Sequence, residues 1–150
     1  MKFSKHEDVN VPQHVLFDKL TNFGNLEREL TRRGLKVSVA DGAPSEGQGA
    51  KWDLAFKFRG KRRTATLEAT KVHSPDAVGL YLENPSMDIR VEIELTALSK
   101  NKTRMMVTSV LQPRTLAARL LVQSMKLGRG RFNKKYAARI KQIAEELGRD

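Results

Sequence analysis

The last third of the chain carries the feature that most constrains the fold. Residues 115–147 predict one long amphipathic helix, because apolar side chains recur there at helical spacing. These positions are Leu116, Leu120, Phe132, Tyr136, Ile140, Ile143 and Leu147. The same stripe passes Ser124 and Gly128, whose side chains are small. The pattern therefore predicts a helix that covers a sheet, and the small residues at its centre are one way to leave room for a cavity.

The chain before this helix alternates as strands do. In residues 87–95 the odd positions are apolar and the even ones are charged, which predicts one buried and one wet face. Residues 52–58 likewise place Trp52, Leu54, Phe56 and Phe58 on one face. Further strands are expected at 3–11, 36–40, 61–72, 78–82 and 103–111. Turn residues separate the later strands at 59–60, 74–76, 84–86 and 99–102.

Two short helices interrupt the strands. Pro12 is suited to the start of the first helix, which carries Val15, Leu16 and Leu20. Asn22 or Asn25 can cap the second, and Gly34 is placed to end it. The order strand, two helices, six strands, helix predicts an α+β fold in one domain, residues 1–150. A curved antiparallel sheet of about seven strands would pack its apolar face around the long C-terminal helix.

Composition limits the chemistry and the partners. The 150 residues include no cysteine, which excludes disulfides and thiolate metal sites. The net charge of +11 favours anionic partners such as nucleic acid or an acidic membrane surface. The N-terminal residues have no apolar core of a secretory signal, and no apolar stretch is long enough to span a membrane, so we expect a cytoplasmic protein.

Three segments resemble the START-like superfamily, which includes the birch-pollen-allergen proteins, the polyketide cyclase/dehydrase-like proteins and the bacterial SRPBCC branch. The segment Val11–Leu20 is similar to the family's first strand-to-helix junction, and Gly47–Trp52 to its Gly-led, aromatic-bearing strand. Residues Thr103–Val107, followed by Pro113 and Leu116–Leu121, resemble its last strand and the start of its last helix. The resemblance implies a helix-grip fold whose sheet and helix enclose an apolar cavity for lipids, polyketides, quinones or similar ligands.

The candidate ligand-binding residues are those expected to face this cavity. They are Trp52, Leu54, Phe56, Leu67, Leu80, Ile89, Val91, Val107, Leu120, Ser124 and Gly128. Ser124 or Thr108 would orient the ligand through a hydroxyl group. A close-packed core with no room for a ligand is the alternative interpretation, and alternation alone does not separate the two. The primary hypothesis is therefore binding of a small hydrophobic ligand, with no cofactor.

A polyketide cyclase/dehydratase-like enzyme is the second hypothesis, although no catalytic motif is visible and catalytic residues are unknown. Such an enzyme needs an ionisable group that faces the cavity. Alternation directs Glu92 and Glu94 outward and leaves the direction of Glu68 open. The three histidines do not have metal-ligand spacing, and no metal site is expected.

An anionic-surface binder, for nucleic acid or an acidic membrane, is the third hypothesis. Basic residues gather at a hairpin tip and on one face of the long helix. They are Arg59, Lys61, Arg62 and Arg63 at the tip, and Arg131, Lys134 and Lys135 on the helix, on a face away from Phe132 and Tyr136. The oligomeric state is left open.

Two glycines leave the continuity of the long helix open. Gly128 and Gly130 each cost about 1 kcal/mol relative to alanine inside a helix. Close contact between the helix and the sheet would account for a glycine at position 128. A kink near the cavity mouth would also account for the two glycines, and so would a complete break that gives two helices.

Overall fold

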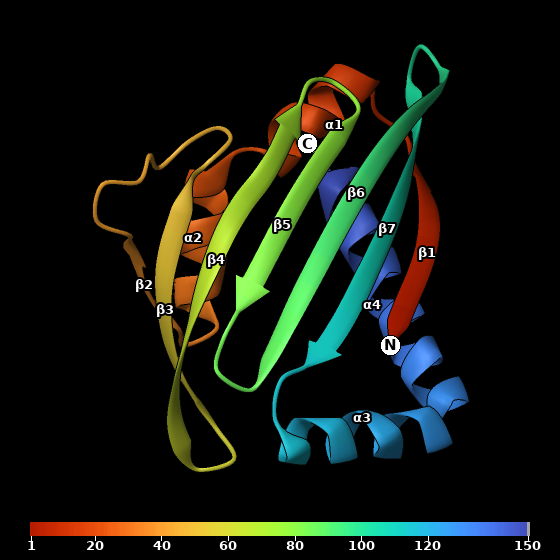
Figure 1. Cartoon of the computed structure of the whole chain (residues 1–150). Coiled ribbons are helices and arrows are strands. Elements are labelled where there is room, and N and C mark those ends of the chain that lie inside the picture. The colour runs from red at the N-terminus through yellow and green to blue at the C-terminus, as the bar shows by residue number, and fades with distance from the viewer. Residues whose placement is uncertain (150) are drawn as a thin grey trace.

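Seven strands and four helices make up the fold in the computed structural model, which describes residues 1–149 (Figure 1). The strands are β1 (Lys2–Val9), β2 (Lys36–Val39), β3 (Lys51–Phe58), β4 (Lys61–His73), β5 (Ala77–Glu83), β6 (Met87–Ser99) and β7 (Lys102–Pro113). The helices are α1 (Gln13–Leu20), α2 (Phe23–Arg32), α3 (Leu116–Leu127) and α4 (Arg129–Leu147). The predicted α+β class and the predicted element order are confirmed up to the C-terminal helix, which is divided in two.

All seven strands form one antiparallel sheet in the order β1-β7-β6-β5-β4-β3-β2. Strands β2 to β7 are consecutive neighbours, as short turns require, and β1 joins the far edge beside β7. The turn between β3 and β4 has only two residues, Arg59 and Gly60, both with positive φ (52° and 75°). This is the tight hairpin geometry that the right-handed twist of paired strands favours.

The sheet curves around its apolar face, and α1, α2 and α4 lie on that side (Figure 1). Asn22 caps α2, because its side-chain oxygen accepts a hydrogen bond from the Asn25 amide at 3.2 Å. Gly34 follows α2 with a φ of +93°, the left-handed conformation that ends many helices. Helix α4 packs mainly along β1, and Phe3 and Tyr136 stack with ring centroids 5.2 Å apart.

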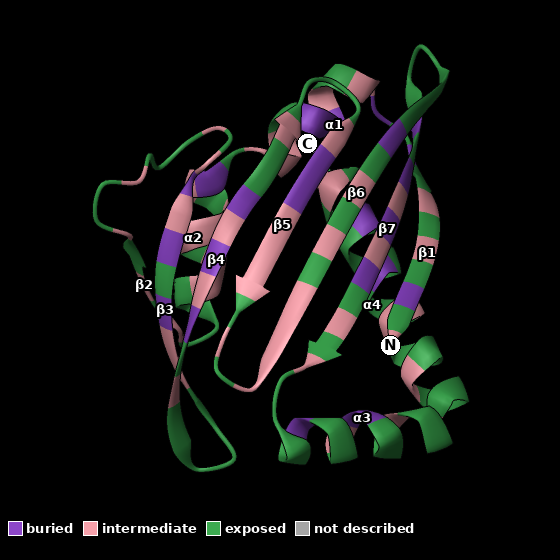
Figure 2. Cartoon of the chain, viewed as in Figure 1, coloured by how far each residue is buried: buried purple, intermediate pink, exposed green. Residues whose placement is uncertain are grey.

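The interior consists of two clusters of buried side chains. One joins α1 and α4 to β1, β6 and β7 and includes Leu16, Met105 and Ile140. The other joins α2 to β3 and β4 and includes Phe23 and Trp52. The lower parts of β5 and β6 have only intermediate burial (Figure 2). The apolar face of the sheet is therefore incompletely covered between the two clusters.

The prediction of one continuous C-terminal helix is wrong, and the break lies at Gly128. This residue has φ −106° and ψ 31°, so it ends α3 and precedes α4, and the two helices run in very different directions (Figure 1). A Cβ atom at Gly128 would meet only the Phe132 ring, at 3.7 Å, and no atom of the sheet. Close contact with the sheet therefore does not explain this glycine, and the alternative of two helices is the one observed.

Gly130 lies in the first turn of α4, and a Cβ there would meet nothing within 4 Å. We expect Gly130→Ala to raise the free energy of unfolding by up to about 1 kcal/mol, because alanine lowers the entropy cost of the helix without a clash. Urea denaturation would measure the change, with Gly42→Ala as a contrast, since Gly42 has a φ of +76°. An unchanged or lower stability of Gly130→Ala would show that this turn is not helical in solution.

Candidate functional site

An apolar hollow of about 800 Å³ lies on the incompletely covered part of the sheet. Side chains of β3 to β6 form its floor, and the end of α2 with the segment that follows it forms one side. The lining residues are Leu30, Arg33, Gly34, Leu35, Lys36, Leu54, Ala55, Phe56, Lys57, Arg62, Leu67, Leu80, Leu82, Ile89 and Val91. A space of this size lined mainly by apolar groups is typical of a small-molecule site.

Antiparallel pairing explains why these side chains share a face. Leu82 pairs with Ile89 and Leu80 with Val91 across β5 and β6, and Leu67 pairs with Leu82 across β4 and β5. Directly paired residues project from the same side of a sheet, so the alternating positions of three strands produce one continuous apolar floor. Each of these side chains except Leu67 is only partly buried, so the floor faces open space rather than a packed helix.

Four cationic side chains stand among the lining residues, and none of the lining residues is acidic. They are Arg33 and Lys36 beside the end of α2, and Lys57 and Arg62 on the β3–β4 hairpin. Arg33 forms a 3.2 Å ion pair with Glu29 on the solvent side of α2. The hollow thus combines an apolar floor with a positively charged rim, in which Lys36, Lys57 and Arg62 occupy the strand positions that alternate with those of the floor residues. This arrangement suits an apolar molecule that carries an acidic group.

Six of the eleven candidate ligand-binding residues line this hollow. They are Leu54, Phe56, Leu67, Leu80, Ile89 and Val91. Trp52 and Val107 are instead buried in the two core clusters. Leu120 and Ser124 lie on exposed positions of α3, and Gly128 is the break between α3 and α4, so these three do not line the hollow. Their placement beneath a continuous helix was wrong because α3 turns away from the sheet after Pro113.

Thr108, expected to orient a ligand, lies on the outer face of β7, and its hydroxyl is 2.9 Å from that of Ser4. Its neighbour Ser109 faces inward, 2.9 Å from the Tyr136 hydroxyl, which also donates to the Val107 carbonyl at 3.3 Å. Burial raises the pKa of Tyr136, so this hydroxyl is neutral at physiological pH. The inward hydroxyl groups therefore hold α4 against β7 rather than line the hollow.

The hollow is also lined by residues that were not among the eleven predicted ligand-binding residues. Leu82 continues the alternation of Val78 and Leu80, so periodicity alone could have included it. The rim could not be found in this way, because its four cations come from two separate segments of the chain, one after α2 and one at the β3–β4 hairpin. Only the pairing of β2 with β3 brings these segments together.

No protein-family model matches the sequence, and no curated protein matches it. Solved structures do match. Norcoclaurine synthase from Thalictrum flavum, in complex with dopamine and hydroxybenzaldehyde, has a TM-score of 0.64 at 11% identity, over 98% of this chain and 86% of the other. An aromatase/cyclase from a Streptomyces species has a TM-score of 0.62 at 16% identity, over 99% and 96%. A START superfamily protein from Mycobacterium smegmatis has a TM-score of 0.57 at 11% identity, over 95% and 98%.

The chain has the START-like, helix-grip fold. The resemblance noted in the sequence is thus confirmed at the level of the fold, since each similar structure is covered over 86% or more of its length. Within this fold, the C-terminal helix of the chain is divided at Gly128. Only α4 grips the sheet, on the side of β1, and the floor formed by β4, β5 and β6 is left accessible.

The three strand carboxylates considered from the sequence as catalytic groups lie away from the hollow. Glu92 and Glu94 are exposed on the outer face of β6, as alternation predicted. Glu68 is also on the outer face, because it pairs with Lys51 and Tyr81 while Leu67 projects inward. Among residues 1–149, no group of three or more His, Asp or Glu side chains could hold a metal ion.

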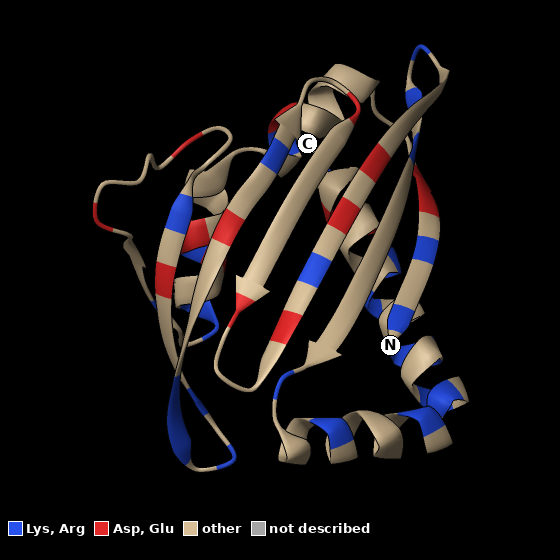
Figure 3. Ribbon diagram, in the orientation of Figure 1, with Lys and Arg blue, Asp and Glu red and all other residues tan. Residues whose placement is uncertain are grey.

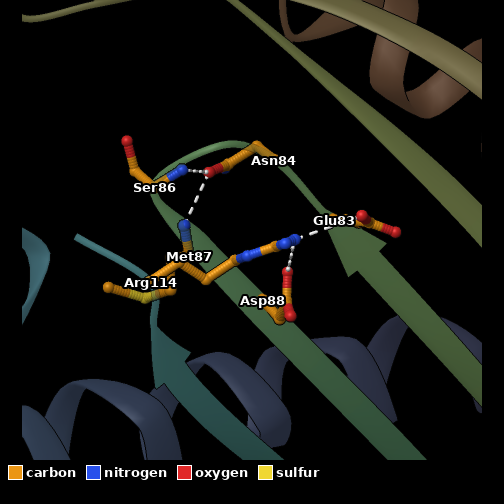
Figure 4. Close-up of polar contacts among 6 residues, drawn as sticks. All are labelled: Glu83, Asn84, Ser86, Met87, Asp88 and Arg114. Atoms are coloured by element: carbon orange, nitrogen blue, oxygen red, sulfur yellow. Dashed lines mark hydrogen bonds and ion pairs between the residues drawn. The ribbon is translucent and has the colours of Figure 1, made fainter.

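A second, more polar hollow of about 1150 Å³ lies along β2, β3 and β4 and reaches the β5–β6 turn. Arg114 stands at its edge, donating to Glu83 at 3.1 Å and to Asp88 at 3.3 Å (Figure 4). Asn84 holds the turn itself, since its side-chain oxygen accepts from the Ser86 and Met87 amides at 2.8 Å. The hydrogen bond from Arg114 to Glu83 helps to raise the pKa of Arg114, so the cation is permanent. This cluster fixes the segment that leads into α3 to the sheet.

The two basic clusters expected from the sequence lie toward the same end of the fold, and all of their residues except the half-buried Arg63 are exposed (Figure 3). Arg59 and Arg63 flank the exposed Phe58 ring at the hairpin tip, at 5.4 and 5.6 Å from its centroid. Arg131 and Lys135 similarly lie 5.7 and 5.8 Å from the centroid of Phe132. The expectation that these helix cations lie away from Phe132 was therefore wrong. No helix among the described residues is long and apolar enough to cross a membrane.

Proposed function

We propose that this protein binds one small hydrophobic ligand that carries an acidic group, such as a fatty acid, in the hollow on β3 to β6. The observation that carries this proposal is the apolar floor with four cations, and no acidic residue, among the residues that line the hollow. The chain of the ligand would contact Leu80, Leu82 and Ile89, and its acidic group would lie near Arg33 or Arg62. The similar structure of norcoclaurine synthase, in complex with dopamine and hydroxybenzaldehyde, supports a small-molecule site in this fold.

Apolar burial supplies most of the expected affinity. Roughly 300 Å² of ligand surface removed from water at about 25 cal/mol/Å² contributes about 7 kcal/mol before the loss of ligand freedom is subtracted. The cationic rim adds an electrostatic contribution that salt screens, because the four side chains are exposed. We therefore expect dissociation constants in the micromolar range for the acid, on the order of 1–10 µM.

One similar structure, an aromatase/cyclase, supports the alternative that the protein is a polyketide cyclase. Such a reaction requires an ionisable group positioned on the substrate. The ionisable groups that line the hollow are the four cations of its rim, and the floor consists of aliphatic and aromatic side chains. The geometry therefore supports binding better than catalysis, and we propose a binding protein.

Titration with a fluorescent fatty acid, cis-parinaric acid, tests the proposal. We expect saturable binding at one site, displaced by palmitic acid about five- to tenfold better than by the alcohol of equal length, since only the acid pairs with the cations. The double variant Lys36→Ala/Arg62→Ala should remove this preference. Lys100→Ala/Lys102→Ala, at the exposed β6–β7 turn, is the matched control. Equal displacement by acid and alcohol would contradict the role of the rim, and absence of binding would contradict the function.

A further inference from the structure

Helix α3 exposes a row of leucines to solvent. Leu116, Leu120 and Leu127 are 71%, 62% and 93% exposed. Their spacing of four and seven residues puts all three on one side of the helix. The opposite side packs against the protein through Ala118 and Val122. We call these three residues the α3 leucine stripe, and nothing in residues 1–149 covers it.

Basic residues border this stripe. Arg119 and Lys126 are seven residues apart on α3, each immediately before a leucine of the stripe, and both are exposed. Arg131, Lys134 and Lys135 follow on the first turns of α4 and are also exposed. The sequence contains no acidic residue between Glu94 and Glu145. The leucines therefore lie in a region of the chain that carries positive charge only.

The β3–β4 hairpin tip adds a second apolar point at the same end of the molecule as α3 (Figure 1). Phe58 is 49% exposed there, with the guanidinium groups of Arg59 and Arg63 beside its ring. No acidic residue occurs between Asp53 and Glu68. Lys57 and Arg62, one step back from the tip, belong to the rim of the hollow.

We propose that this end of the molecule docks on the surface of a membrane that contains anionic lipids. The α3 leucine stripe and Phe58 would enter the boundary between headgroups and acyl chains, and the surrounding lysines and arginines would bind the headgroups. An exposed apolar row beside basic side chains is the arrangement by which interfacial helices bind bilayers. The docking surface does not depend on what the hollow holds.

A second copy of the chain and a nucleic acid are the two other candidate occupants of this surface, and both fit its features less well. A second copy of the chain would bring two molecules of net charge +11 together through their most basic region, which like-charge repulsion opposes. A nucleic acid would bind the cations but would leave the leucines without an apolar partner, since its exposed surface is mostly charged backbone. The anchored start of α3, where Arg114 binds Glu83 and Asp88, keeps the stripe directed outward.

Vesicle flotation tests this proposal. Vesicles of phosphatidylcholine with about one-third phosphatidylglycerol should bind the protein at least about tenfold better than phosphatidylcholine alone, and binding should fall with added salt. Leu120→Glu/Leu127→Glu should lower the partition coefficient at least about tenfold, since apolar contact is lost. Arg119→Glu/Lys126→Glu should lower it about as much. Two controls, Leu98→Glu and Lys100→Glu/Lys102→Glu, alter exposed residues at the β6–β7 turn, which lies at the opposite end of the sheet. Both control proteins should bind the vesicles as the unaltered protein does.

Three outcomes would overturn the proposal. The first is binding that is insensitive to the leucine variant, which would leave only an electrostatic surface. The second is a dimer, seen by sedimentation, that Leu127→Glu dissociates, which would identify a second copy as the occupant. The third is a lack of vesicle binding together with tight binding of a DNA duplex. Circular dichroism of each variant verifies the fold. The fatty-acid titration without vesicles tests the ligand site independently, so it distinguishes failure of the membrane-docking proposal from failure of the proposed ligand site.

Discussion

Replacing Ile89 by aspartate is expected to weaken fatty-acid binding at least about a hundredfold. Ile89 lies on β6 in the floor of the hollow, paired with Leu82 across β5. A carboxylate there would lose water when the ligand chain covered it, and transfer of a charge to apolar surroundings costs several kcal/mol. About 2.8 kcal/mol of this cost corresponds to the hundredfold loss. The cis-parinaric acid titration measures it directly.

The free protein should tolerate this substitution, because Ile89 is only partly buried and faces open space. Val110→Asp is the matched control, since Val110 is an exposed apolar residue on the neighbouring strand β7 and is paired with Arg90 on the outer face. It should bind the fatty acid as the unaltered protein does. If both variants bind normally, the ligand site lies elsewhere. If both lose binding, the effect comes from the fold and not from the hollow.

Trp52→Ala should lower the free energy of unfolding by about 3–5 kcal/mol, the range for loss of a large buried aromatic side chain. Trp52 is 1% exposed and forms an edge-to-face contact with Phe23 of α2, with centroids 5.2 Å apart. Its indole N–H also donates to the Glu27 carboxylate at 2.7 Å. The substitution would therefore leave a cavity in the cluster that joins α2 to the sheet, and it would remove the donor to Glu27.

Urea denaturation measures this loss, and Glu27→Gln separates its two causes. Glutamine keeps an oxygen that can accept from Trp52, so this variant should cost no more than about 1 kcal/mol. Because α2 forms one side of the hollow, Trp52→Ala should also weaken fatty-acid binding, although Trp52 does not line the hollow. A loss of less than about 1 kcal/mol for Trp52→Ala would show that α2 is not anchored through this residue.

The strand layout could be predicted from the sequence because each strand has one face in water. In β6, Ile89, Val91 and Ile93 alternate with charged residues, and the structure places them on opposite sides as expected. The two-residue turn at Arg59 and Gly60 was equally clear. Register then followed from the short turns, so six of the residues predicted for the cavity do line the hollow.

The C-terminal region could not be predicted to the same degree. Apolar spacing from Leu116 to Leu147 shows which side of a helix is apolar, but it does not show that this side is covered. In α4 the positions of Tyr136, Ile140 and Ala144 do face the sheet. In α3 the apparent continuation of the stripe faces solvent, and Ala118 and Val122 are buried instead. A single glycine with non-helical angles changes which face is covered, and periodicity carries no signal of that change.

The central claim is that the ligand lies on the floor that β3 to β6 form, and NMR with a spin-labelled fatty acid locates it most directly. Methyl groups of Leu, Ile and Val would be observed with stearic acid carrying a nitroxide on its chain. We predict strong broadening of Leu80, Leu82, Ile89 and Val91, reversed by palmitic acid. The methyl groups of Leu98 and Val110 should keep their intensity. Broadening that excludes the floor residues, or that spreads evenly over the protein, would contradict the account.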